Sequence, residues 1–146
     1  MREILFRGKR IDNGEWVYGN LIKRLNYDEL SVKYYAIQEI TSASCHNFAR
    51  VIPETVGQYT GLKDKNGKKI FEGDIVKAIQ TEYDEYKESE PFVFSFVGEM
   101  IFDDACFGLK AKKGIDFYSP FWKEENVELE VIGNIIDNPE LLEVEQ

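Results

Sequence analysis

The chain has few of the residues from which metal sites, disulfide scaffolds and nucleophilic enzymes are built. Its 146 residues include two cysteines, Cys45 and Cys106, and one histidine, His46. A secreted disulfide scaffold carries a denser set of cysteines, so we expect a cytoplasmic protein with two reduced thiols. A structural zinc site needs four ligands, typically Cys or His in closely spaced pairs. We therefore predict no metal and no cofactor.

The sequence also lacks a recognisable catalytic motif. Cys45 and His46 are neighbours, and neighbouring residues on a strand point to opposite faces, so we interpret them as loop or core residues. No phosphate-binding loop, dinucleotide fingerprint or nucleophile elbow is present. We predict no catalytic residue and no enzyme, while an enzyme with an unrecognised site remains an alternative.

Long apolar runs are absent as well. The first seven residues, MREILFR, are not followed by the apolar stretch of a signal peptide. No apolar run approaches the roughly 18 residues that a membrane-spanning helix needs. We expect no contact with a membrane.

Aromatic residues are abundant, and they favour strands. Ten Phe, eight Tyr and two Trp stand against four Pro, and aromatic side chains suit the pleated, half-buried surface of a sheet. Asp12-Asn13-Gly14 predicts a hairpin turn. The expected strands, with no regular helix between them, cover 3–7, 15–22, 32–40, 55–62, 70–79, 92–97, 99–102, 107–111 and 128–136. This pattern predicts a single all-β domain over residues 1–146.

Some connecting segments carry their own predictions. Residues 80–90 read as an exposed acidic loop, and Pro120 can start a short helix through Glu125. Pro139 follows a capping-type residue, which predicts a short C-terminal helix. In Glu72-Gly73-Asp74, we expect Asp74 to stabilise a turn by accepting backbone N–H groups, although paired carboxylates also do acid–base chemistry.

Charge is unevenly distributed along the chain. The net charge is −9, yet residues 1–26 carry six basic and three acidic groups, whereas residues 91–146 carry four and twelve. This argues against non-specific affinity for nucleic acid but leaves room for a local basic face. The candidate interaction surface comprises Arg7, Lys9, Arg10, Trp16, Tyr18, Tyr59, Lys65, Lys68 and Lys69.

Each charged region has a plainer explanation. The basic residues, with Lys23 and Arg24, can form a binding face on which aromatic rings stack bases. Alternatively, the aromatics belong to the core and the lysines solubilise a hairpin tip. The acidic stretch Glu82–Glu90 and the region beyond Asp116 can stand in for phosphate or form an ordinary solvated surface.

Five sequence blocks resemble the YopX-like proteins of phages and prophages. They are residues 6–10 (FRGKR), 14–19 (GEWVYG), 52–62 (IPETVGQYTGL), 64–76 (DKNGKKIFEGDIV) and 131–142 (VIGNIIDNPELL). The resemblance implies a small β-rich fold with an SH3-like barrel element and an origin in the phage or prophage of a Gram-positive bacterium. It implies no activity and supplies no catalytic residues.

Together, these observations predict an all-β, mostly β fold. We expect a small SH3-like barrel, an N-terminal β-hairpin extension and a short C-terminal helix. The leading hypothesis for function is a non-enzymatic phage accessory or binding module in the cytoplasm of a bacterial host. It contacts a host or phage protein or its own copies. The alternative is a nucleic-acid-binding module that uses the basic N-terminal and 63–77 hairpins.

Overall fold

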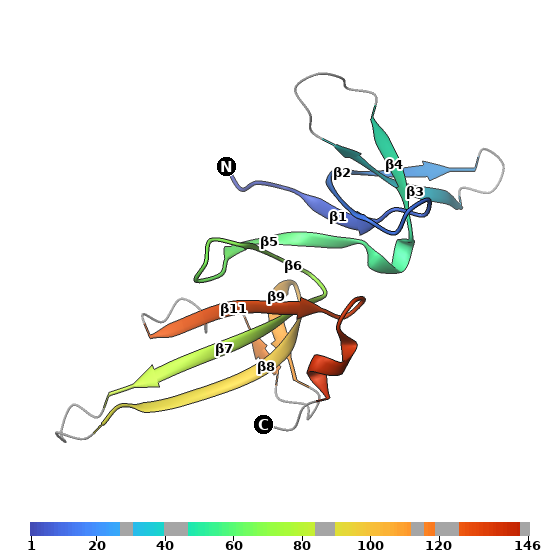
Figure 1. Cartoon of the computed structure of the whole chain (residues 1–146). Coiled ribbons are helices and arrows are strands. Elements are labelled where there is room, and N and C mark those ends of the chain that lie inside the picture. The colour runs from blue at the N-terminus through green and yellow to red at the C-terminus, as the bar shows by residue number, and fades with distance from the viewer. Residues whose placement is uncertain (27–30, 40–46, 84–89, 112–115, 119–125, 144–146) are drawn as a thin grey trace. The chain divides into compact units, whose positions relative to one another are not determined.

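The computed structural model describes residues 1–26, 31–39, 47–83, 90–111, 116–118 and 126–143. The chain divides into two compact units, Met1–Gly61 and Leu62–Gln146 (Figure 1). Each unit is built on antiparallel strands, so the predicted mostly β fold is confirmed. The prediction of one domain over the whole chain stays a prediction.

The first unit is an antiparallel sheet that begins with the predicted hairpin. Gly14 has the positive φ, 71°, that the Asn-Gly turn requires. The elements are β1 (Phe6–Lys9), β2 (Trp16–Leu25), β3 (Val32–Glu39), β4 (Phe48–Val51), the 3-10 helix η1 (Pro53–Thr55) and β5 (Gly57–Lys63). The sheet order is β4-β3-β2-β1-β5-β6. The last residues of β5 and its hairpin partner β6 (Lys69–Phe71) belong to the second unit.

Alternate residues of these strands form the core of the first unit. Val17, Ile37 and Val51 are at most 2% exposed and pack together. Close backbone approach supports this packing: a Cβ at Gly19 would lie 1.9 Å from the carbonyl oxygen of Gln38. Only glycine therefore fits where β2 passes β3.

The predicted small SH3-like barrel is not confirmed in the described strands. β4 and β6 are the two ends of the first sheet, and β10 and β11 are the two ends of the second. Arg10 and Val51 form an isolated bridge that joins the chain after β1 to the end of β4. This single bridge brings β1 and β4 together in a curled sheet but is not the continuous ladder of a closed barrel. The N-terminal hairpin is part of this sheet rather than an extension beside a barrel.

The second unit is a five-stranded antiparallel sheet. Its strands are β7 (Asp74–Glu82), β8 (Phe92–Asp103), β9 (Cys106–Lys110), β10 (Asp116–Tyr118) and β11 (Val127–Asn134), in the order β10-β9-β8-β7-β11. Residues from five strands meet in one core: Ile70, Val76, Ala78, Met100, Phe107, Leu109 and Leu129. The two strands predicted on either side of Gly98 are one continuous strand, β8. The loop predicted over residues 80–90 begins later than expected, because β7 continues to Glu82. Residues 84–89 lie outside the described residues.

The prediction of a C-terminal helix is wrong for the described residues. Residues Pro139–Leu142 form a four-residue 3-10 helix, η3, that starts with the expected proline. The side chain of Asn138 makes no cap; instead its Oδ1 accepts a long hydrogen bond from the Asn134 N–H at 3.4 Å. Atoms of Asn138 and Leu141 lie 2.8 Å from the Cβ position at Gly133, so η3 is a tight turn packed over β11. The helix predicted from Pro120 to Glu125 lies outside the described residues.

Candidate binding surfaces

The register of the first sheet determines which side chains face outward. Lys9 lies opposite Trp16 and Arg7 opposite Tyr18, and directly opposite residues share a face. Val17, which is buried in the core, lies on the other face. Alternation along the paired strands gives the outward set: Arg7, Lys9, Trp16, Tyr18, Asn20, Ile22, Arg24, Tyr34, Gln38, Phe48 and Arg50. Ala36 lies on the same side of the sheet but is fully buried.

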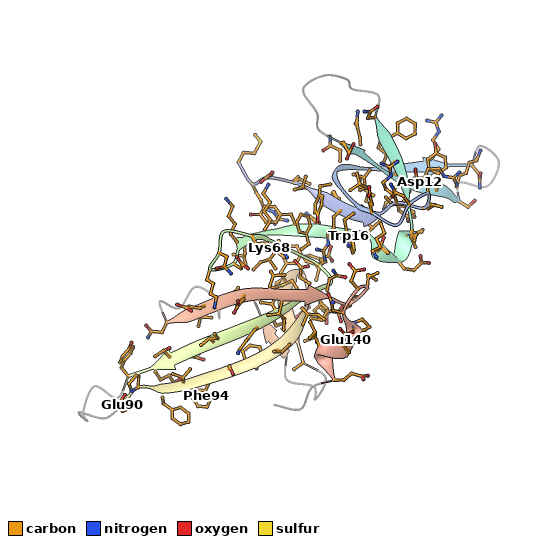
Figure 2. All side chains as sticks on the ribbon, in the orientation of Figure 1. Asp12, Trp16, Lys68, Glu90, Phe94 and Glu140 are labelled. Carbon is orange, nitrogen blue, oxygen red and sulfur yellow. The ribbon has the colours of Figure 1, made fainter. Side chains whose placement is uncertain are left out.

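One cation–aromatic cluster lies on β1 and β2. The Arg7 guanidinium carbon is 4.7 Å from the centroid of the Trp16 ring, and the Lys9 ammonium nitrogen is 5.7 Å from it. Figure 2 labels Trp16 in this region. Arg7 is buried, Lys9 and Trp16 are half-buried, and Tyr18 is 46% exposed. This cluster brings together four of the nine residues predicted as an interaction surface.

A second cluster lies on β2, β3 and β4. The Arg50 guanidinium carbon is 4.7 Å from the centroid of the Tyr34 ring, and Arg24 lies directly opposite Tyr34 across β2 and β3. Both arginines are exposed. Sequence reasoning named Arg24 but missed Tyr34 and Arg50, because only the pairing of β3 with β4 brings these distant residues together.

The outward set carries four cations, Arg7, Lys9, Arg24 and Arg50, and includes no Asp or Glu among the described residues of β1–β4. The one carboxylate in these strands, Glu39, lies opposite Gly19, on the other face. The other face also carries Lys23, which lies opposite Tyr35, so the outward face differs in having cations without a carboxylate, an arrangement that suits a polyanionic ligand.

Two other predicted surface residues of the first unit have structural partners. Arg10 makes a two-pronged ion pair with Asp12, whose oxygens are 2.9 and 2.7 Å from its Nε and Nη2. The hydrogen bond to Asp12 raises the pKa of Arg10, and the same bond lowers the pKa of Asp12. Tyr59 is only 4% exposed and packs in the interior.

The predicted lysines at residues 63–69 lie in the second unit, around a buried carboxylate. Asp64 Oδ1 accepts the backbone N–H groups of Asn66 at 2.8 Å and Lys68 at 2.9 Å, and its Oδ2 accepts that of Val131 at 3.1 Å. Burial alone would raise the pKa of Asp64, but these hydrogen bonds outweigh it, and the pKa is lowered. Asp64 thus connects the hairpin tip to β11.

The lysines on this hairpin differ in exposure and pairing. Lys65 makes an ion pair with Glu130 at 2.8 Å. Lys68 is exposed and Lys69 is half-buried. The proposed interaction surface is therefore divided between the two units of the chain.

The Glu72-Gly73-Asp74 turn is structural, as expected. Gly73 has a φ of 79°, and Asp74 Oδ2 accepts the Phe71 N–H at 2.8 Å while the Asp74 residue is 1% exposed. The Gly73 N–H donates to the Met100 carbonyl at 2.8 Å. The carboxylate of Asp74 holds the turn that starts β7.

The remaining reactive residues form no cluster in the described part of the chain. Cys45 and His46 lie outside the described residues. Cys106 is a free thiol, and its Sγ lies 3.4 Å from the Asp103 carbonyl oxygen. No group of three or more His, Cys, Asp or Glu that could hold a metal occurs among the residues that the structure describes.

An apolar surface occupies the first half of β8. Phe92, Val93 and Phe94 are 60%, 57% and 48% exposed, and the rings of Phe92 and Phe94 touch edge to face at 4.3 Å. Figure 2 labels Phe94 near Glu90, where the β7–β8 ribbon ends. β9 pairs only with Glu99–Asp103, so residues 92–98 pair along one edge with β7 and with no other described strand.

No helix in the described ranges is long and apolar enough to cross a membrane.

Two antiparallel sheets, one with a cationic outer face and one with an exposed apolar strand, define a mostly β protein with surfaces suited to binding. The YopX protein family matches residues 5–143, nearly the whole chain. The chain belongs to this family, as the sequence resemblance predicted.

Two solved structures share the fold. Protein EF1440 from Enterococcus faecalis is 24% identical, with a TM-score of 0.52 over 97% of this chain and 99% of that chain. Protein yopX from Bacillus subtilis is 19% identical, with a TM-score of 0.52 over 100% of both chains. No curated protein matches the chain.

Proposed function

We propose that this chain is a non-enzymatic accessory protein of a phage or prophage that acts through protein–protein contacts in the cytoplasm of its bacterial host. The first contact in this proposal is with a second copy of the chain. The observation that carries the proposal is the exposed apolar stretch at the start of β8.

The sequence of this stretch is typical of a strand covered on both faces. Phe92, Phe94 and Phe96 alternate with Val93, Ser95 and Val97, so apolar side chains lie on both sides of the strand. A strand with apolar residues on both faces usually lies inside a protein. The other edge of β8, over residues 92–98, pairs with no described strand, and another strand can add to such an edge.

A second copy fits this edge by simple symmetry. An antiparallel pair centred on Ser95 places Val93 opposite Val97 and Phe94 opposite Phe96 of the other copy. No two like charges lie opposite each other over residues 92–98. Beyond this stretch, each copy's Glu90 approaches the end of the other copy's β9, where Lys110 is exposed.

The test is the mass of the protein in solution over a range of concentrations, measured by analytical ultracentrifugation. We expect the mass to rise from the 17.0 kDa of one chain towards twice that value. Ser95→Lys places two like charges opposite each other at the symmetry centre and keeps the protein monomeric. Ser31→Lys makes the same change at an exposed serine of the first unit and behaves like the wild type.

Two results contradict the proposal. A wild-type protein that stays monomeric at every concentration removes the contact between copies. Dimerisation of Ser95→Lys to the same extent as Ser31→Lys shows that the copies meet elsewhere.

A further inference from the structure

We infer that the outer face of β1–β4 in the first unit binds single-stranded nucleic acid. This inference rests on the cationic face of the first sheet and is independent of the β8 contact. It also differs from the sequence-based alternative, because the residues come from four strands rather than from two basic hairpins.

Charge is the first argument. The first unit carries eight Lys and Arg against seven Asp and Glu, and the second carries ten against twenty, so their net charges are +1 and −10. The four cations of the outward set share one side of the sheet. Exposed charges interact weakly beyond the Debye length, about 8–10 Å at physiological salt, so the local cations dominate what a bound phosphate experiences.

Aromatic exposure is the second argument. Tyr18 is 46% exposed and Phe48 is 57% exposed, and both belong to the outward set. The neutral side chains of Asn20 and Gln38, which are paired across β2 and β3, belong to the same face. Exposed rings beside cations are the combination by which sheet proteins hold single strands, since every base has a face that can stack.

The cation–aromatic pairs add preorganisation. A guanidinium stacked on an aromatic ring keeps its N–H donors pointing outward in its own plane, parallel to the ring. From there they can still reach a phosphate. The Arg50 guanidinium carbon lies over the Tyr34 ring, 4.7 Å from its centroid, and Arg50 is exposed. Because the side chain is already restrained, less conformational freedom is lost when it binds.

Single strands fit this face better than duplexes. The face is a curled sheet surface, whereas readout in the major groove uses an inserted helix or a two-stranded ribbon. Exposed rings can stack only on bases that are free of their duplex partners. Because phosphate contacts release counterions, the affinity falls as salt rises.

The experiment measures fluorescence anisotropy of labelled oligothymidylate and oligouridylate, each about 12 nucleotides long, between about 50 and 200 mM salt. We expect both to bind, with a duplex of the same length binding more weakly. Arg7 is buried, so three phosphate contacts, from Lys9, Arg24 and Arg50, give a slope of log affinity against log salt of about −2.1. A difference between the two oligonucleotides identifies whether DNA or RNA is preferred.

The matched variants separate local contacts from overall charge. Arg24→Gln with Arg50→Gln lowers affinity at least about tenfold at 50 mM salt and makes the slope shallower by about 1.4. Lys33→Gln with Lys68→Gln removes the same charge from exposed positions outside the outward set and leaves the affinity within about twofold. Thermal unfolding confirms that both double variants are folded.

A second pair of variants tests stacking. Phe48→Ala lowers affinity at least about fivefold and leaves the salt slope unchanged, because a stacked base is lost but no phosphate contact. Tyr83→Ala removes a ring that is 66% exposed in the second unit and has no effect. Repeating the titration with Ser95→Lys gives the wild-type result, so failure of the β8 contact does not affect this test.

Three outcomes overturn the inference. The first is no binding at the lowest salt, and the second is equal loss in the two charge double variants. The third is that oligoglutamate competes as strongly as oligothymidylate and that Phe48→Ala binds with the wild-type affinity. That result would assign the face to an acidic protein partner.

Discussion

The two units of this chain position their strands by different means. In the first, glycines allow close backbone approach: Gly19 lies against the Gln38 carbonyl, and the Cβ position of Gly8 lies 3.0 Å from the Cβ of Val51. In the second, two buried carboxylates, Asp64 and Asp74, accept backbone N–H groups at the turns. The first arrangement is sensitive to added volume and the second to lost charge.

The two units also differ in net charge and in the kind of side chain that they expose. The first unit is nearly neutral, and the outward face of its sheet carries cations but no carboxylate among the described residues of β1–β4. The second unit has a net charge of −10 and exposes apolar side chains at the start of β8. A substitution or a change of pH is therefore expected to affect the stability of one unit more than that of the other. Each unit can be perturbed while the other serves as a reference.

The largest effect is expected for Gly19→Ala. A Cβ 1.9 Å from a backbone oxygen forces β2 and β3 apart, which costs about 3 kcal/mol or more. Hydrogen exchange followed by mass spectrometry should show lost protection in β1–β4 and retained protection in β7, β8 and β11. Gly98→Ala is the control in the second unit, because its Cβ meets its nearest neighbours at 3.2–3.3 Å and needs only small shifts.

The same measurement tests whether the chain is one domain. If Gly19→Ala removes protection from both units together, they unfold as a single cooperative unit, as the sequence predicts. If only the first unit loses protection, the two are separate in stability.

What the sequence predicts well here is local. The Asn13-Gly14 hairpin and the Gly73-Asp74 turn are both present, because a few adjacent residues determine backbone conformation at these sites. The cluster of Arg7, Lys9 and Trp16 could be predicted from the sequence for the same reason, since one hairpin brings these residues together.

What the sequence does not predict depends on distant pairing. Arg50 reaches Tyr34 only through the register of β3 with β4. The boundary between the units falls at Gly61, inside β5, where no linker-like composition marks it. The C-terminal segment forms a 3-10 turn because η3 packs over Gly133, a tertiary contact that local propensity does not contain.

The second-largest effect is expected for Asp64→Ala. It leaves three backbone donors, those of Asn66, Lys68 and Val131, without this acceptor. We expect a loss of about 2–3 kcal/mol in the second unit and a melting temperature lower by roughly 10 °C or more. Asp12→Ala is the control, because its carboxylate binds Arg10 on an exposed turn of the first unit. An equal loss in the two variants would contradict the structural role of Asp64.

A smaller effect is expected from pH. The pKa of Asp64 is lower in the folded protein than its ordinary value of 3.8, so the unfolded chain binds the proton more tightly. Its stabilisation is therefore present above the ordinary pKa and is lost as pH falls through the folded pKa. Urea unfolding at pH 7 and near pH 3 should show the difference between wild type and Asp64→Asn narrowing at the lower pH. A constant difference would show that the charge of Asp64 is not what binds the three N–H groups.

The smallest effect is expected for Glu99→Gln, at the point where β9 begins to pair with β8. Burial raises the pKa of Glu99 above its ordinary value of 4.5, and Lys110, its partner across β8 and β9, only partly opposes this. Folding therefore favours the protonated carboxyl, and stability falls as pH rises from the unfolded to the folded pKa. At pH 7, Glu99→Gln should raise the stability of the second unit by less than about 1 kcal/mol, since the group is half-exposed. The gain should disappear near pH 4, where the wild-type carboxyl is protonated, and Glu128→Gln at an exposed position of β11 is the matched control. A less stable Glu99→Gln at pH 7 would mean that attraction to Lys110 outweighs burial and that the second unit tolerates this charge.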